Sequence, residues 1–191
     1  MKKVFIVTGI VFAILLAMFF AVVFWFWLMF GGASYFVHVP KPAVTYGEFP
    51  FKLTYEFHGN TKVIEDTIIC EFDGFEVVGE AGKYRRWKAH LKSGKEYITL
   101  FDARKLIAEK DYEGNKILEL YFDWGNAEYY MGDTMRHACG AQSLDEVCYL
   151  YRAKEKRTIG HSVVGAKMAL EKYKIELISW EVAPPIENTF N

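Results

Sequence analysis

Three carboxylates in the second half of the chain could supply acid–base chemistry. Asp123, Glu128 and Asp133 lie in a short stretch that also holds Trp124 and Tyr130. Two carboxylates that face one cleft about 5 to 10 Å apart can act as the acid and the base of glycoside hydrolysis. The stretch therefore raises the hypothesis of an enzyme that acts on the cell envelope. It contains no recognisable catalytic motif, so we assign no catalytic residue.

A serine near the C-terminus raises the question of nucleophilic chemistry. Gly160-His161-Ser162 precedes an expected helix and is similar to the nucleophile elbow of α/β-hydrolases. That elbow requires glycine two residues after the serine, whereas Val164 stands there and the glycine is displaced to Gly165. These hydrolases also place their histidine after the serine, and no histidine follows Ser162. The segment is therefore predicted to be an ordinary turn.

The three cysteines and five histidines are too scattered to predict a metal centre. A zinc site needs two close pairs of ligands, whereas His137, Cys139 and Cys148 supply at most three ligands at an unusual spacing. No metal and no cofactor are therefore expected. Cys139 and Cys148 are predicted to form a disulfide if the domain faces an oxidising compartment, and free thiols are the alternative. Cys70 lies in an apolar run and is predicted to be a buried strand residue.

A basic segment at 83–92 is the clearest candidate for a binding surface. Alternate side chains of a strand point to opposite faces, which directs Trp87, Ala89 and Leu91 inward. The outward set is Tyr84, Arg86, Lys88, His90 and Lys92. Such a row could contact anionic lipid head groups or wall polymers. The alternative is a solvated strand face that is balanced by carboxylates elsewhere on the surface.

Two adjacent aromatic residues form a second candidate for ligand binding. Tyr129 and Tyr130 precede Gly132 and Asp133, which favour a turn. Exposed rings beside a turn are typical of sugar-binding surfaces, whereas buried rings would pack against a sheet. The two interpretations differ in the exposure of the rings, and both stay open at the level of sequence.

The elements that must position these residues begin with an apolar N-terminal segment. Residues 4–30 contain no charged side chain, which predicts a transmembrane helix with Trp25 and Trp27 near its end. Lys2 and Lys3 precede it, so the N-terminus is predicted to be cytoplasmic and the remainder extracytoplasmic. A cleaved signal peptide is the alternative, although its apolar region normally runs only about 7 to 15 residues. An uncleaved single-pass anchor in the cell membrane is therefore expected.

One face of this predicted helix carries small side chains. Gly9, Ala13, Ala17 and Ala21 recur at intervals of four residues. Such a stripe lets two helices approach closely, which suggests a homodimer through the membrane helix. The alternative is that alanine is simply common in membrane spans.

The rest of the chain is predicted to hold a Gly/Pro linker and one β-rich domain. The predicted organisation is a cytoplasmic tip at 1–3, a transmembrane helix at 4–30, a linker at 31–42 and a domain at 43–191. Hydrophobic alternation predicts strands at 51–57, 63–72, 83–91, 96–101, 104–110, 116–122 and 174–182. A turn at 58–60 joins the first two strands into a hairpin, and a helix over 163–173 is expected to have Ser162 as its N-cap. The fold class is therefore α+β: one transmembrane helix, then a mainly antiparallel β domain, sandwich-like or barrel-like, with one C-terminal helix.

Composition excludes two classes of protein. With 23 Lys+Arg against 24 Asp+Glu, the formal net charge is -1, which lacks the basic excess of nucleic-acid-binding proteins. A content of 17% aromatic and 25% charged residues also argues against a disordered chain. The composition is therefore typical of a folded domain that is attached to a predicted transmembrane segment.

Six short segments occur in order over most of residues 47–188. They are GEFPF at 47–51, EDTIICEFDG at 65–74, GKYRRW at 82–87, YYMGD at 129–133, ISWE at 178–181 and PIEN at 185–188. In these segments the chain resembles an uncharacterised family of short, membrane-anchored exported proteins of Gram-positive bacteria, for which no activity is assigned. The resemblance implies an anchor followed by a domain, and no catalytic residue.

The expected function is therefore a non-catalytic binding module at the cell envelope. Its partner would be a protein, a wall polymer or a lipid surface, and the bilayer itself holds the anchor. The alternative is an envelope hydrolase that uses a pair of the carboxylates described above.

Overall fold

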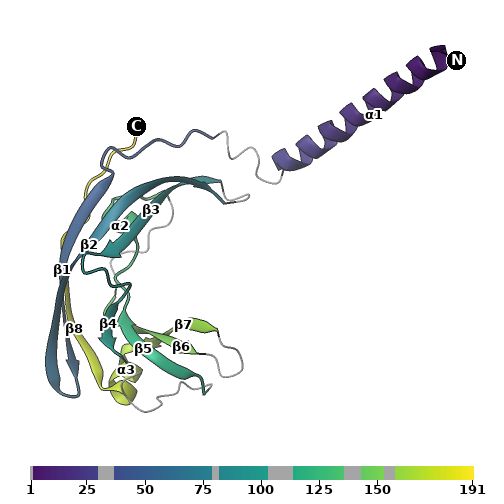
Figure 1. Cartoon of the computed structure of the whole chain (residues 1–191). Helices are drawn as coiled ribbons and strands as arrows, with labels where there is room; N and C mark the ends of the chain where they lie inside the picture. The colour runs from purple at the N-terminus through teal and green to yellow at the C-terminus, as the bar shows by residue number, and fades with distance from the viewer. Residues whose placement is uncertain (1, 30–36, 79–81, 103–113, 136–142, 153–157) are drawn as a thin grey trace. The chain divides into compact units, whose positions relative to one another are not determined.

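The computed structural model describes residues 2–29, 37–78, 82–102, 114–135, 143–152 and 158–191, with side chains from residue 8 onward. The helices in these ranges are α1 (Lys2–Met29), α2 (Ala127–Tyr130) and α3 (Ala166–Tyr173). The strands are β1 (Tyr46–Phe57), β2 (Asn60–Val77), β3 (Lys83–Leu91), β4 (Ile98–Phe101), β5 (Lys116–Phe122), β6 (Glu146–Arg152), β7 (Ile159–Gly165) and β8 (Ile175–Val182). They form two four-stranded sheets, in the orders β3-β2-β1-β8 and β4-β5-β6-β7 (Figure 1). The fold is therefore α+β, with antiparallel sheets as predicted.

The chain divides into two compact units. The first, which we call the N-terminal unit, consists of Met1–Lys41 and Asp73–Arg86. It holds α1 and the turn end of the β2–β3 hairpin. The second, which we call the sheet unit, consists of Pro42–Phe72 and Trp87–Asn191. It holds the rest of both sheets together with α2 and α3.

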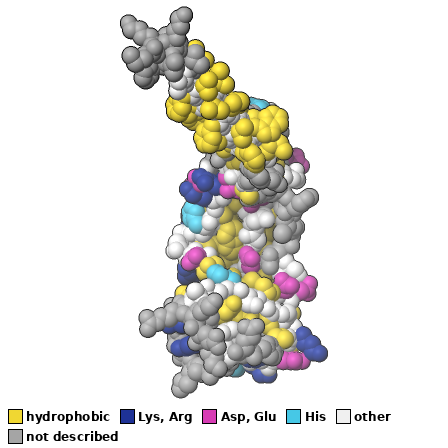
Figure 2. All heavy atoms as spheres, turned by 90° about the vertical axis from the view of Figure 1, so that its right-hand side faces the viewer, with side chains coloured by type: hydrophobic (Ala, Val, Ile, Leu, Met, Phe, Trp, Pro, Cys, Tyr) yellow, Lys and Arg dark blue, Asp and Glu magenta, His cyan; other side chains and the backbone are white. Residues whose placement is uncertain are grey.

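α1 is long and apolar enough to cross a membrane. Its segment Thr8–Met29 has 22 residues, and at about 1.5 Å per residue it matches the roughly 30 Å hydrocarbon core of a bilayer. The most apolar stretch of this helix is not buried by the rest of the described chain, and its side chains present an apolar surface (Figure 2). The rings of Phe24 and Trp27 stack near the C-terminal end with their centres 5.8 Å apart. The apolar helix predicted over 4–30 is therefore present as α1.

The β1–β2 hairpin organises the first sheet. Between the two strands, His58 and Gly59 have φ angles of 51° and 73°, the left-handed pair that a type I′ turn requires. The predicted hairpin is therefore confirmed. β1 begins before the predicted 51–57 because Pro50 is accommodated inside the strand, where its carbonyl accepts the Ala183 N–H at 3.0 Å.

The end of the second sheet corrects the predicted helix boundary. β7 occupies part of the segment assigned to a helix over 163–173, so Ser162 is a strand residue and no N-cap. Val164 is buried opposite β6, and β-branched residues favour a strand. α3 begins only at Ala166, after Gly165, which makes no side-chain capping bond.

Most of the other predicted strands are confirmed. The predictions at 83–91 and 116–122 coincide with β3 and β5, while those at 96–101 and 174–182 contain β4 and β8. The strand predicted over 104–110 lies outside the described residues. β6 and β7 are strands that the sequence pattern did not predict.

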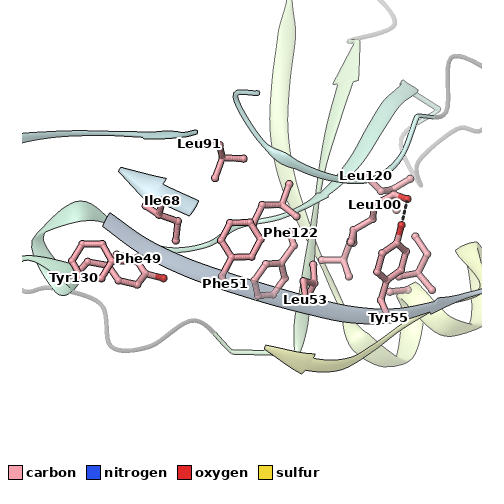
Figure 3. Close-up of a cluster of buried hydrophobic side chains, with 14 of the residues drawn as sticks. Phe49, Phe51, Leu53, Tyr55, Ile68, Leu91, Leu100, Leu120, Phe122 and Tyr130 are labelled. Carbon is pink, nitrogen blue, oxygen red and sulfur yellow. Dashed lines mark hydrogen bonds between the residues drawn. The ribbon is translucent and has the colours of Figure 1, made fainter. Parts of the chain in front are cut away.

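The hydrophobic core lies between the two sheets of the sheet unit (Figure 3). The core residues labelled in Figure 3 come from both sheets and from α2: Phe49, Phe51, Leu53, Tyr55, Ile68, Leu91, Leu100, Leu120, Phe122 and Tyr130. The Tyr55 hydroxyl donates to the Leu100 carbonyl at 3.0 Å, which joins β1 to β4 across the core. The ring of Phe122 on β5 packs 4.9 Å from that of Trp180 on β8. Aromatic contacts of this kind add to the free energy gained by apolar burial.

The C-terminal tail pairs with the first residues of the sheet unit. The Asn188 side chain donates to the Val44 carbonyl at 2.8 Å and accepts from the Val44 N–H at 2.9 Å. The Ala43 N–H donates to the Thr189 carbonyl at 2.7 Å. Pro42, the last residue of the predicted linker, also bridges to this tail and therefore belongs to the folded domain.

Candidate functional site

β7 forms one edge of the second sheet in the part of the chain that the structure describes. It carries no Lys, Arg, Asp or Glu, and its side chains alternate in exposure. Ile159 and Val163 are 57% and 50% exposed. Natural edge strands are commonly protected by charge, proline or a bulge, because their outward N–H and C=O groups can pair with another chain. An uncharged edge with exposed apolar residues is therefore a candidate interaction surface.

An apolar groove of about 200 Å³ lies beside this edge. Its lining comes from β6, β7 and α3: Tyr149, Val163, Val164, Gly165, Met168 and Tyr173. We call it the β7–α3 groove. Tyr149 pairs with Ser162 and Val147 with Val164, so these side chains share one face of the sheet. A strand added to β7 would direct alternate side chains to that same face.

The other face of the second sheet carries an aromatic cluster. Tyr121 on β5 pairs with Cys148 on β6, and the Tyr121 hydroxyl lies 3.0 Å from Nδ1 of His161 on β7. The ring of Tyr97 packs against that of Tyr121 with centres 4.5 Å apart. A cysteine, a tyrosine and a histidine are thus brought together, although the sequence separates them widely.

This cluster does not have the electrostatics of a nucleophilic site. A cysteine nucleophile requires a lowered pKa, whereas burial and then the Asp123 carboxylate raise the pKa of the Cys148 thiol. Burial also raises the pKa of the Tyr121 hydroxyl. Ser162 lies inside β7 and pairs with Tyr149, so the turn predicted there is wrong and the serine has no strand-to-helix elbow.

Buried acidic groups predict a loss of stability in alkali. Burial raises the pKa of the Cys70 thiol from 9.0 to about 12. Below pH 9 both states keep this proton, but between pH 9 and 12 the unfolded chain releases it first. The free energy of unfolding should therefore fall as the pH rises through this window, by at most about 1.4 kcal/mol per pH unit for this group. Burial raises the pKa of Tyr130 in the same direction.

Denaturant titrations of the full-length protein in detergent, repeated across this pH window, would measure the slope. C70A should lower stability at every pH and flatten the slope, whereas C139S serves as the control and should keep it. Identical slopes for the two variants would contradict the assignment of the titration to Cys70.

Two of the three predicted carboxylates, Asp123 and Asp133, have structural partners, and the third, Glu128, lies in the first turn of α2. Asp133 is 1% exposed, and its carboxylate accepts from Trp87 Nε1 at 2.9 Å and from the Met135 N–H at 3.0 Å. The Asp123 carboxylate accepts from the Gly125 N–H at 3.0 Å, which stabilises a turn. The Asp133 side chain is therefore occupied by the fold.

Neither of the two adjacent tyrosines is exposed as a ring that stacks on a sugar would be. Tyr130 is 1% exposed, and its hydroxyl donates to the Trp124 carbonyl at 2.6 Å. Tyr129 is half-buried and packs edge-on against Tyr130 at 5.2 Å. The ring of Tyr130 lies in the core, which favours the packing interpretation over ligand binding for this residue.

The alternation predicted for the basic strand is observed in β3. Among the predicted outward residues, Tyr84 is half-buried and the exposed ones are Arg86, Lys88, His90 and Lys92. In the N-terminal unit, Arg86 Nε lies 2.8 Å from Asp73 Oδ2. In the sheet unit, Lys92 Nζ lies 3.0 Å from Glu48 Oε2. The strand therefore offers less uncompensated positive charge than the sequence indicates.

A second cleft, of about 420 Å³, lies on the first sheet. Its lining is Pro50, Phe51, Lys52, Glu65, Asp66, Glu181 and Val182. Lys52 stands in register with Glu65 on one side and Glu181 on the other, and Lys52 Nζ lies 4.0 Å from Glu65. The lining sets Lys52 against three carboxylates, and the Lys52 and Glu65 side chains are 46% and 69% exposed, so the cleft is acidic and in contact with water. The β7–α3 groove is the better candidate for an apolar ligand.

The remaining predicted sites concern cysteines and the small-residue stripe. Cys148 is a buried free thiol, and its predicted disulfide partner Cys139 lies outside the described residues, as does His137. Within the described ranges, no group of three or more His, Cys, Asp or Glu is placed to hold a metal ion. The stripe on α1 is exposed along its whole length: Gly9, Ala13, Ala17 and Ala21.

Comparison of the chain with known protein families, with curated proteins and with solved structures gives no match in any of the three.

Proposed function

We propose that this protein is a single-pass membrane-anchored, extracytoplasmic domain that binds a partner at the cell envelope without catalysing a reaction. The observation that carries the proposal is the uncharged edge strand β7 beside the apolar β7–α3 groove. Exposed sheet edges of this kind recruit extended peptides by strand addition. The second support is α1, which is long and apolar enough to span a bilayer.

The chemistry of the groove favours an extended polypeptide with apolar side chains at alternate positions. The strand edge would supply main-chain hydrogen bonds, and the groove would accept every second side chain. All of its lining residues are uncharged, so a charged side chain would lose its hydration without gaining an ion pair. A protein partner is therefore favoured over an anionic wall polymer at this site.

The β7 edge predicts the effect of one substitution. Val163 is 50% exposed, and its pairing with Cys148 directs its side chain to the face opposite Val164. V163D is expected to weaken peptide binding by about tenfold or more, because an added strand loses an apolar contact of about 1.5 kcal/mol with Val163 and meets a charge at the strand edge. The probe is a labelled synthetic peptide that alternates valine with threonine and has lysines at its ends for solubility. Its affinity for the full-length protein in detergent is measured by fluorescence anisotropy.

The matched control is V63D, because Val63 is 51% exposed and lies on a strand, but outside the groove. V63D should bind the peptide as the unaltered protein does. Equal losses in both variants, or no binding by the unaltered protein, would contradict the proposed binding site.

The anchor and its orientation are supported by the N-terminal sequence. Lys2 and Lys3 precede α1, which favours a cytoplasmic N-terminus and an extracytoplasmic sheet unit. A signal sequence shares the position and the hydropathy of α1, but its apolar region is usually shorter. The resemblance to exported, membrane-anchored proteins of Gram-positive bacteria agrees with this layout.

Two further proposals have less support. An envelope hydrolase would need a pair of carboxylates free to act, and Asp133 is engaged with Trp87 and Met135. A homodimer through the α1 stripe would bring two anchors together, because small side chains such as Ala13 and Ala17 permit close approach.

A further inference from the structure

We infer that the partner of the β7 edge is a second copy of this chain, whose β7 pairs antiparallel with the first across a two-fold axis at His161. The inference rests on the proposed function, in which the β7 edge receives an added strand. The residues that carry it belong to the sheet unit and lie in β7 or in the strands of the same sheet.

The hydrogen-bonding groups of alternate β7 residues point away from β6. The Ala166 N–H donates to the Asp145 carbonyl at 2.6 Å, one step beyond the end of β7 in the same register. Hydrogen-bonded and non-hydrogen-bonded pairs alternate along an antiparallel ladder, and this register is continuous over the whole of β7. The N–H and C=O groups of Ile159, His161 and Val163 are therefore directed outward, where an added strand would meet them.

The exposed apolar side chains of this edge are symmetric about His161. Ile159 and Val163 lie two residues to either side of it and are 57% and 50% exposed. A second β7 that runs antiparallel, with His161 opposite His161, therefore places Ile159 of each copy against Val163 of the other. A register shifted by two residues would instead set Val163 against His161 and Ile159 against Gly165. The pairing about His161 covers four apolar side chains, and the strand is complementary to itself in this register.

β7 brings neither a fixed charge nor a bulky obstruction to the two-fold axis. It contains no Lys, Arg, Asp or Glu, and like charges opposite each other would destabilise a symmetric strand pair. Nδ1 of His161 lies 3.0 Å from the hydroxyl of Tyr121 on β5, so the ring leans across β6 and away from the edge. Two His161 residues can therefore stand opposite each other while the two backbones approach.

The symmetric pairing also covers the edge of both copies at once. The contact uses the same strand on each side, so it closes after two chains and leaves neither β7 open to further pairing. A strand from an unrelated protein would need an uncharged edge of its own with matching apolar positions. The arrangement of Ile159 and Val163 about His161 therefore favours a second copy as the occupant.

Cysteine cross-linking of the full-length protein in detergent tests the pairing. The background is C139S/C148A, because Cys148 stands opposite Val163 on β6 and could capture a new thiol there. A short homobifunctional thiol reagent is added, and covalent dimers are measured on a denaturing gel. Residues of a hydrogen-bonded antiparallel pair lie about 5.5 Å apart, so two H161C chains should be joined. I159C is the matched control, because four residues at about 3.3 Å each separate it from the same residue of the second copy.

We expect H161C to give severalfold more covalent dimer than I159C, and a mixture of I159C and V163C to give more than either variant alone. V163D added to H161C should abolish the cross-link, and an excess of the valine–threonine peptide should reduce it, because both act on the same edge. Equal cross-linking of H161C and I159C, or none in either, would overturn the inference.

Two further results separate this inference from the other proposals. Loss of the H161C cross-link in A13L/A17L but not in V163D would place the dimer contact on α1 and overturn the pairing through β7. If H161C gives no cross-link and the labelled peptide still binds the unaltered protein, the second copy is not the partner and the proposed edge binding stands. If the peptide also fails to bind, both proposals are wrong.

Discussion

G132A should lower the free energy of unfolding by about 3 kcal/mol or more. Gly132 has a φ of 63°, in the left-handed region that an alanine disfavours by about 1–2 kcal/mol. An added Cβ would also collide with the Ile186 carbonyl oxygen and lie 3.3 Å from the Asn188 nitrogen. These atoms belong to the backbone of the C-terminal tail, so they cannot rotate away as a side chain would.

The matched control is G94A, which separates the two causes. Gly94 also has a left-handed φ, of 75°, but nothing lies within 4 Å of the position of its Cβ. This variant should lose only the backbone contribution of about 1–2 kcal/mol. Urea titrations of the full-length protein in detergent, followed by tryptophan fluorescence, would measure both. Equal losses of unfolding free energy in G132A and G94A would mean that the C-terminal tail does not restrict the space at Gly132.

The same collision predicts which part of the fold is released first. The Ile186 N–H donates to the Tyr130 carbonyl at 2.9 Å, which holds the tail against the end of α2. In G132A this tail must move, so amide exchange at Ile186 should accelerate more than exchange in β5. Uniform acceleration across the sheet unit would instead indicate a global loss of stability.

D133A should destabilise the protein by about 2–4 kcal/mol, the second large effect. Asp133 is 1% exposed, and its removal strands the Trp87 indole N–H and the Met135 N–H without their acceptor. An unsatisfied buried donor such as the Trp87 indole N–H costs about 1–3 kcal/mol, and the part-buried Met135 N–H adds to this loss. D145A is the control, because Asp145 is exposed and accepts mainly from the neighbouring Ser143 hydroxyl; its loss should stay within about 0.5 kcal/mol.

A double-mutant cycle with W87F tests the same hydrogen bond directly. Phenylalanine removes the indole donor, so W87F and D133A should be less than additive, with a coupling of about 1 kcal/mol or more. Strict additivity would mean that the Trp87–Asp133 bond contributes nothing to stability, and that Asp133 acts through its other contacts.

Local signals allowed much of the fold to be predicted. His58 and Gly59 favour a type I′ turn wherever apolar alternation flanks them, so the β1–β2 hairpin follows from the sequence. The predicted helix start failed because Val163 and Val164 satisfy both a helical and a strand pattern over so short a stretch. Pairing with β6 decided the outcome, because Val163 and Val164 stand in register with Cys148 and Val147.

The candidate site could not be predicted in the same way. Tyr130 and Asp133 look like surface groups beside a turn, and the structure buries both. The β7–α3 groove joins Tyr149 on β6, Val164 on β7 and Met168 on α3, which are three different elements. Exposure at a groove depends on which strands become neighbours, and no single segment of sequence contains that information.

The sequence by itself determined the features that depend on composition and short-range pattern: an apolar segment long enough to cross a membrane, a turn with left-handed residues, and strands with one apolar face. Only the tertiary structure decided that β7 lies at a sheet edge and that Asp133 binds Trp87. The physical reason is the sequence separation between the residues that interact. Backbone preference and hydropathy act within a few residues, whereas burial and edge position are set by contacts between segments far apart in the chain.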